Sequence, residues 1–66
     1  MGETMIFTIG KQIRIERFAK RITQKRLAEL LGVSVYTVSR WENDHYKPQG
    51  KNLLAIQRVL GRNLYE

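Results

Sequence analysis

Hydrophobic residues recur at spacings of three and four over most of this 66-residue chain, which is the period expected of amphipathic helices. The pattern is most regular in "KNLLAIQRVLG", residues 51–61, where Gly61 follows the last apolar residue as a stop signal. Its apolar positions are Leu53, Ile56, Val59 and Leu60. No stretch of comparable length alternates with the period of two that a strand requires, so the sequence predicts an all-α fold.

A less regular helical pattern covers about residues 8–20. Ile9 and Ile13 lie four residues apart, and Phe18 and Ile22 follow them. The first eight residues, "MGETMIFT", carry no comparable signal. We therefore expect one domain over residues 1–66, with an ordered core from about residue 8 to residue 61.

Local signals mark two short helices in the middle of the chain, over about residues 24–31 and 35–43. Thr23 and Ser34 each precede one of them and can accept a hydrogen bond from an unpaired amide in its first turn. Gly32 follows the first helix where a left-handed residue is common. "NDHYKPQG" then predicts a loop, and "RNLYE" can begin a fifth turn or helix capped by Asn63. The prediction is therefore a compact bundle of four to five helices.

Two helices of about eight residues joined by a short turn with a glycine are typical of the helix-turn-helix, whose second helix lies in the DNA major groove. Ala28 is small enough to let the two helices approach each other closely. The residues expected to turn inward are Leu27, Leu31, Val33, Val38 and Trp41. For Trp41 we favour a place in the core over a stacking surface, because it shares a face with Val38 and Leu31.

The outward face of the second of these helices has an unusual composition. It carries Ser34, Val35, Tyr36, Ser39 and Arg40. A core would be more apolar, and an ordinary solvent face would hold more Glu and Lys. Methyl groups, hydroxyls and an arginine suit a surface that meets base edges, so we predict that this set reads DNA bases.

The charge of the chain agrees with a polyanionic partner. Twelve Lys and Arg against six Asp and Glu give a net charge of +6 and a pI near 10.2. Nine of the twelve basic residues precede Pro48. This balance favours nucleic acid as the partner.

Other classes of site lack the residues that they need. The chain has no cysteine and a single histidine, His45, so we expect no metal site and no cofactor. No apolar run is long enough for a membrane span, and no secretory signal is evident, so we expect a cytoplasmic protein. No small-molecule ligand is evident from the sequence either. No catalytic arrangement is apparent either, and we expect no enzyme.

The segment "TQKRLAELLGVSVYTVSRWENDHYKP", together with "LLAIQRVLG" and "IGKQIR", resembles the Cro and phage-repressor-like (Xre-like) family of helix-turn-helix DNA-binding regulators. The resemblance covers roughly residues 9–61. It implies a lambda-repressor-like bundle that binds a near-palindromic double-stranded DNA operator as a homodimer. It also implies a transcriptional regulator that acts as a repressor, with the recognition helix at about residues 34–43.

The resemblance also implies roles for residues outside the base-reading set. Gln24 matches a residue that contacts a phosphate and braces the recognition helix. Arg17 and Glu42 match a partly buried ion pair between the first and third helices. The full set expected at the sugar-phosphate backbone is Gln24, Lys25, Asn43 and Lys47. The set expected to hold the fold is Trp41, Val38, Leu31, Ala28, Gly32, Arg17 and Glu42.

Three positions depart from the family pattern. Glu16 stands where relatives often have leucine, so either the first helix uses Ile15 or Phe18 for the core or its packing is weaker. Arg21 replaces a glycine between the first two helices, and Gly50 replaces an apolar residue before the fourth. A second class of function, an antitoxin or a protein-interaction adaptor on the same helical fold, is the alternative to transcriptional regulation.

Overall fold

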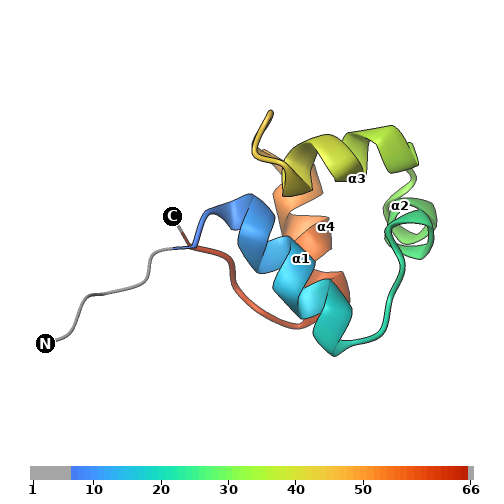
Figure 1. Ribbon diagram of the computed structural model, residues 1–66, viewed down its shortest axis with the longest axis horizontal. Helices are drawn as coiled ribbons and strands as arrows, with labels where there is room; N and C mark the ends of the chain where they lie inside the picture. The colour runs from blue at the N-terminus through green and yellow to red at the C-terminus, as the bar shows by residue number, and fades with distance from the viewer. Residues whose placement is uncertain (1–6, 66) are drawn as a thin grey trace, which may run out of the picture.

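The computed structural model describes residues 7–65 and shows four helices packed around one core (Figure 1). They are α1 (Ile9–Ala19), α2 (Gln24–Leu31), α3 (Val35–Glu42) and α4 (Lys51–Leu60). Residues 7–65 contain no strand, which confirms the all-α prediction. Four or five helices were expected, and four are found in residues 7–65, because residues 61–65 are not helical.

Three of the four helices have an N-cap residue whose side-chain hydroxyl accepts a hydrogen bond from the first turn. The Thr8 hydroxyl accepts a hydrogen bond from the Lys11 amide at 3.1 Å, and Thr23 accepts one from the Arg26 amide at 3.0 Å. Ser34 does the same for the amide of Thr37 at 3.1 Å. Each bond pairs an amide that has no partner inside its own helix, which is why the helices begin at these points.

Left-handed backbone separates the helices. Gly32 ends α2 with φ 73°, and Gly61 ends α4 with φ 68°, as their positions in the sequence predict. Arg21, where the family has glycine, also has a positive φ of 58°. Its amide donates to the Phe18 carbonyl at 3.0 Å, so the turn between α1 and α2 keeps its geometry without the usual residue.

All four helices supply the core. Five of its side chains are fully buried, and they are Ile13, Leu27, Val38, Ile56 and Leu60. Trp41 and Ala28 are buried beside them. Leu31 and Val33 are partly buried and pack against this cluster. The core therefore fixes α3 against the rest of the bundle along one side of that helix.

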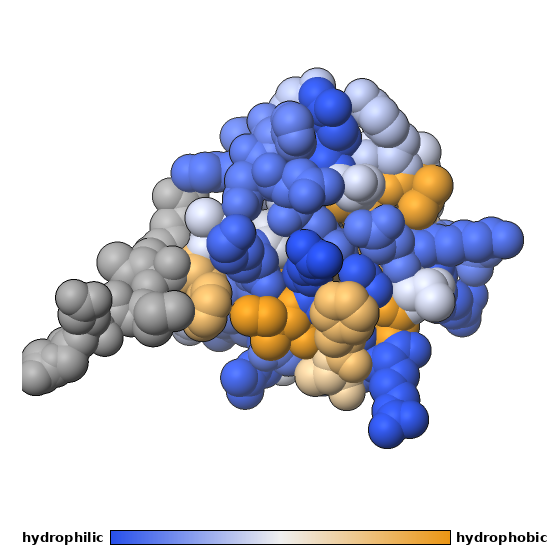
Figure 2. Space-filling view, in the orientation of Figure 1, coloured by the Kyte–Doolittle hydropathy of each residue, from blue (hydrophilic) through white to orange (hydrophobic). Residues whose placement is uncertain are grey.

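The outer face of α1 differs from the prediction. Ile15 is 46% exposed and Phe18 is 60% exposed, so the interpretation that either replaces a core leucine is wrong. Figure 2 shows hydrophobic side chains reaching the surface over α1. Glu16 is partly buried, and its carboxylate lies 3.3 Å from Nε of Arg62. Glu16 thus makes an ion pair at the position where relatives often have leucine.

The segment after α4 packs as a non-helical chain where the sequence allowed a fifth helix. Leu64 is buried in the core, and its amide donates to Oε1 of Gln57 at 2.8 Å. The amide of Tyr65 donates to Oε1 of Gln12 at 3.1 Å, and Nε2 of Gln12 donates back to the Tyr65 carbonyl. Side chains thus take the backbone groups that a helical turn would need. Asn63, expected as a cap, donates instead to the Tyr65 hydroxyl at 3.3 Å.

Gly10 lets the first turn of α1 lie against the end of α3. A Cβ added at this position would overlap the carbonyl oxygen of Trp41 and crowd the side chain of Asp44. Because Trp41 contributes a backbone atom here, the clash could not be relieved by a change of rotamer. The close approach places the N-terminus of α1 beside the loop that follows α3.

Candidate nucleic-acid interface

The turn between α2 and α3 holds these helices in a fixed arrangement. Ala28 is only 3% exposed where the two helices approach each other. The amide of Val33 donates to the Ala28 carbonyl at 3.0 Å, across the left-handed Gly32. The short turn and the small buried side chain together present α3 along an edge of the molecule (Figure 1).

The two sides of α3 have different environments. Val38, Trp41 and Glu42 are buried. The side expected to read bases lies outward: Val35 is 47% exposed and Tyr36 is 63% exposed. Ser34 is exposed as well, and Ser39 and Arg40 are partly buried. The structure therefore brings the five predicted base-reading residues together at one short helix, four of them on α3 and Ser34 at its N-cap.

Hydrogen bonds within α3 already use some of these polar groups. The Ser34 hydroxyl caps the helix and also lies 3.0 Å from Oγ1 of Thr37. Nδ2 of Asn43 donates to the Ser39 carbonyl at 2.9 Å and to the Ser39 hydroxyl at 3.3 Å. Asn43 is the C-cap of α3 rather than part of the helix, so its amide sits at the end of the exposed side.

Arg40 lies against two aromatic rings. Its guanidinium carbon is 5.2 Å from the centroid of the Tyr36 ring and 5.3 Å from that of the Tyr46 ring. Such distances allow cation–π attraction. Tyr46 was not among the residues that the sequence singled out, because it lies in a loop without an apolar period. The neighbours of Tyr46 in the sequence are Asp44, His45 and Lys47, and they do not indicate a contact with Arg40.

A buried polar network ties α3 to α1 and α2. Nε of Arg17 donates to Oε2 of Glu42 at 2.7 Å, and a terminal nitrogen of Arg17 donates to Oε1 at 3.0 Å. The side chains of Arg17 and Glu42 are 8% and 2% exposed, respectively. Arg17 also donates to the Ile22 carbonyl at 2.9 Å, and Nε2 of Gln24 donates to Oε1 of Glu42 at 3.0 Å.

The ion pairs leave a surplus of positive charge at the surface. Every acidic residue within 7–65 lies in an ion pair with a basic residue. These pairs are Lys11 with Asp44, Arg17 with Glu42, Arg26 with Glu29, and Arg62 with Glu16. Lys25, in the first turn of α2, and Lys47, in the loop after α3, are both exposed. In Figure 2 blue, hydrophilic residues lie over the loop after α3, whereas the surface at α3 itself is mostly pale, with an orange patch.

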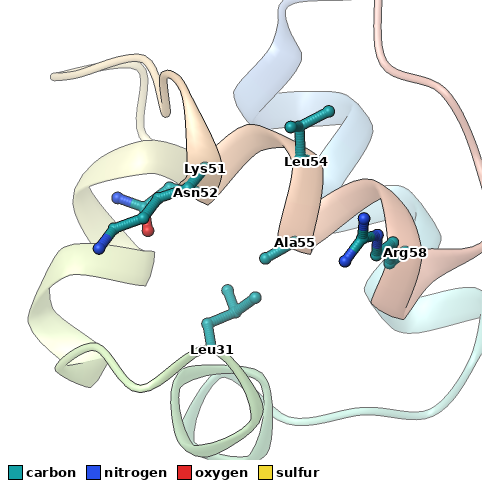
Figure 3. A pocket seen from close by; sticks show the side chains of 6 residues that line it. All are labelled: Leu31, Lys51, Asn52, Leu54, Ala55 and Arg58. Atoms are coloured by element: carbon teal, nitrogen blue, oxygen red, sulfur yellow. The ribbon is translucent and has the colours of Figure 1, made fainter.

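A second surface feature is an open groove between the end of α2 and α4 (Figure 3). Its lining consists of Leu31, Lys51, Asn52, Leu54, Ala55 and Arg58. The residues are apolar, amide or basic, and the base-reading set is not among them. Within residues 7–65 no three His, Cys, Asp or Glu side chains are grouped so as to hold a metal ion. No helix in this range is long and apolar enough to cross a membrane.

Comparison with known protein families and sequences gives a consistent result. The helix-turn-helix family matches residues 11–66. The HTH-type transcriptional regulator DicA of Escherichia coli (strain K12) is 45% identical over 58 residues, which is 88% of this chain and 43% of DicA. Repressor protein C2 of Salmonella phage P22 is 38% identical over 52 residues, 79% of this chain and 24% of that protein. The chain thus spans less than half the length of either relative.

Two solved structures of the P22 c2 repressor have the same fold. The crystal structure of that repressor in complex with synthetic operator 9T aligns with a TM-score of 0.83 and 34% identity, covering 88% of both chains. The solution structure of its DNA-binding domain aligns with a TM-score of 0.84 and 33% identity, covering 91% of this chain and 79% of that one. The four-helix arrangement is therefore that of a phage-repressor DNA-binding domain.

Proposed function

This chain belongs to the helix-turn-helix family, in agreement with its resemblance to Cro and phage-repressor-like regulators, and we propose that it is a sequence-specific DNA-binding transcriptional regulator. The observation that carries the proposal is the division of α3, whose inner side is locked into the core while its outer side presents small, hydroxyl and basic groups. DicA is a transcriptional regulator and the P22 C2 protein is a repressor, which supports repression as the direction of control.

In this proposal α3 lies in the major groove of a double-stranded operator. Arg40 pairs with guanine, while the apolar surfaces of Val35 and Tyr36 meet thymine methyl groups. The hydroxyls of Ser34 and Ser39 complete the base-reading set. The groups that hold the sugar-phosphate backbone are Gln24, Lys25, Asn43 and Lys47. Nε2 of Gln24 carries two hydrogens, so the bond to Glu42 leaves one for a phosphate oxygen.

We further propose that two copies bind a near-palindromic operator, each placing α3 in a successive major groove about 34 Å apart on one face of the duplex. The protein acts by binding alone, without a cofactor or an enzymatic step. Its place in the cell is then the cytoplasm, on the nucleoid. The P22 c2 repressor bound to its synthetic operator supports DNA as the partner.

Affinity for duplex DNA is expected to fall steeply with salt. Basic groups that neutralise phosphates release counterions, so the log-log slope of affinity against salt should be near 0.9 for each phosphate contacted. Fluorescence anisotropy with a labelled random duplex between low and physiological salt measures this slope. Absence of duplex binding at low salt would contradict the proposal and favour the protein-interaction alternative.

Arg40→Ala and Gln24→Ala are expected to affect binding in different ways. Loss of Arg40 should relax the preference at one base pair per half-site, because a bidentate contact to guanine contributes about 1 to 3 kcal/mol of discrimination. Loss of Gln24 should weaken binding to all sequences alike and lower the melting temperature, since Glu42 also loses a hydrogen bond. Both variants are measured on an operator selected from random duplexes and on its single-base variants.

The reverse pattern would contradict the placement of α3. If Arg40→Ala lowered affinity equally for every operator variant while Gln24→Ala changed the base preference, the two roles would be exchanged. Arg58→Ala is a matched control, because this exposed arginine lies on α4 and lines the groove between α2 and α4. It should leave the base preference unchanged.

A further inference from the structure

The surroundings of Arg40 restrict how its side chain can meet a ligand. Nε of Arg40 is buried and has no hydrogen-bond partner among residues 7–65. No ion pair within that range uses the guanidinium either. Arginine can present guanine with either Nε and one terminal nitrogen or with both terminal nitrogens. Since Nε is covered, only the end of the guanidinium remains available for a bidentate contact.

The two rings beside Arg40 come from different parts of the chain. Tyr36 precedes Arg40 by one helical turn on α3, so its position follows from helix geometry. Tyr46 lies four residues beyond the end of α3, in the loop, and reaches the same guanidinium only because the backbone turns back. The contact with Tyr46 is therefore a property of the loop.

Hydrogen bonds fix the loop in this position. Asp44 has a positive φ of 64°, and its amide donates to the Trp41 carbonyl at 3.1 Å. The amide of His45 donates to the Arg40 carbonyl at 2.9 Å. The reversal of the chain at these residues brings the ring of Tyr46 over the guanidinium. The loop is thus anchored to the same residue whose side chain it covers.

We propose that Tyr46 is a positioning residue for sequence recognition, which holds the Arg40 guanidinium end-on toward one base pair of the operator. The inference rests on the proposed function of α3 and adds a residue outside that helix to the determinants of specificity. A free arginine side chain samples many rotamers, and ordering it on DNA reduces the gain from a correct pair. Contact with both rings orders the side chain before DNA arrives.

The test compares Tyr46→Leu and Tyr46→Phe with the parent protein on a selected operator and its single-base variants. Tyr46→Leu should reduce discrimination at the base pair read by Arg40 by about twofold to fivefold, the size expected of one exposed cation–π contact. Discrimination at other positions should stay the same. Tyr46→Phe keeps the ring and should match the parent.

Two further measurements separate positioning from a structural role. Tyr46 is 58% exposed, so Tyr46→Phe should melt with the parent, and Tyr46→Leu should melt at most about 4 to 8 °C lower, the shift expected from the loss of one cation–π contact. Tyr65→Leu is the control, because Tyr65 is 68% exposed and contacts neither Arg40 nor α3 through any hydrogen bond, ion pair or ring contact found in residues 7–65. The base preference of the Tyr65→Leu variant should be that of the parent.

Three results would overturn the inference while leaving the proposed function intact. In the first, Tyr46→Leu weakens binding to all sequences equally, which would make Tyr46 a backbone contact. In the second, Tyr46→Phe behaves like Tyr46→Leu, which would assign the effect to the hydroxyl. In the third, Tyr46→Leu sharpens discrimination, which would mean that the ring hides Arg40 from DNA. Failure of the parent protein to bind any duplex would instead remove the proposed function itself.

Discussion

Trp41→Ala is expected to lose about 3 to 5 kcal/mol of unfolding free energy, the usual cost of removing a large buried aromatic side chain. Trp41 is 4% exposed and packs in a core to which all four helices contribute. A domain of 66 residues has only about 3 to 10 kcal/mol of stability in total. The variant should therefore be largely unfolded or melt far below the parent in a thermal or urea titration followed by circular dichroism.

Phe18→Ala serves as the matched control for this variant. The same kind of truncation at Phe18 removes a ring that is 60% exposed, and it should cost less than about 1 kcal/mol. Coincident melts of Trp41→Ala and the parent would show that Trp41 is outside the core. A loss at Phe18 equal to that at Trp41 would show that α1 buries the face that the structure leaves exposed.

The positions of the helices could be predicted because their signals are local. Thr23, Ser34 and Gly32 act on amides and carbonyls within a few residues, and each has the role that its position in the sequence indicates. The division of α3 into a buried and an exposed side could be predicted equally well from the sequence. It depends only on the helical period of Val38 and Trp41.

What the sequence could not show depends on contacts between distant segments. Gly10 has no special signal within its helical pattern, and the neighbouring Trp41 carbonyl and Asp44 side chain are what leave no room for a Cβ there. Phe18 was counted among the apolar positions of α1 but lies outside the core, because five residues separate it from Ile13 and place it on another face of the helix. The segment around Leu64 is non-helical, with its backbone bound by Gln12 and Gln57, and no local pattern in "RNLYE" encodes either partner.

The same distinction applies to the candidate site. The base-reading residues could be proposed together because one helix carries them all. Tyr46 was missed, since its contact with Arg40 follows from the turn at Asp44, where a non-glycine residue adopts positive φ. The hydrogen bond from Gln24 to Glu42 was missed as well, although the resemblance had given Gln24 a role in bracing α3. Which group a polar side chain binds depends on contacts between segments that are distant in the sequence.

Arg17→Met and Glu42→Leu are each expected to lose about 3 to 5 kcal/mol, because each single change leaves the other charge buried without its counter-ion. The matched control is the ion pair of Arg26 and Glu29, whose side chains are 61% and 53% exposed. Glu29→Ala should cost at most about 1 kcal/mol, since solvent screens that pair. Urea titrations of the three variants and the parent give these differences.

The double variant Arg17→Met/Glu42→Leu should be more stable than either single variant, because no isolated charge remains in the interior. For the double variant to be more stable than either single variant, the coupling energy from the cycle must exceed the larger single loss, which is about 3 to 5 kcal/mol. Full recovery is not expected, since the Ile22 carbonyl loses the hydrogen bond from Arg17. Additive losses would contradict a buried pair. If the double variant folds but binds its operator more weakly at every sequence, then the pair acts by orienting α3 relative to α1 and α2. It would not act through any contact with DNA.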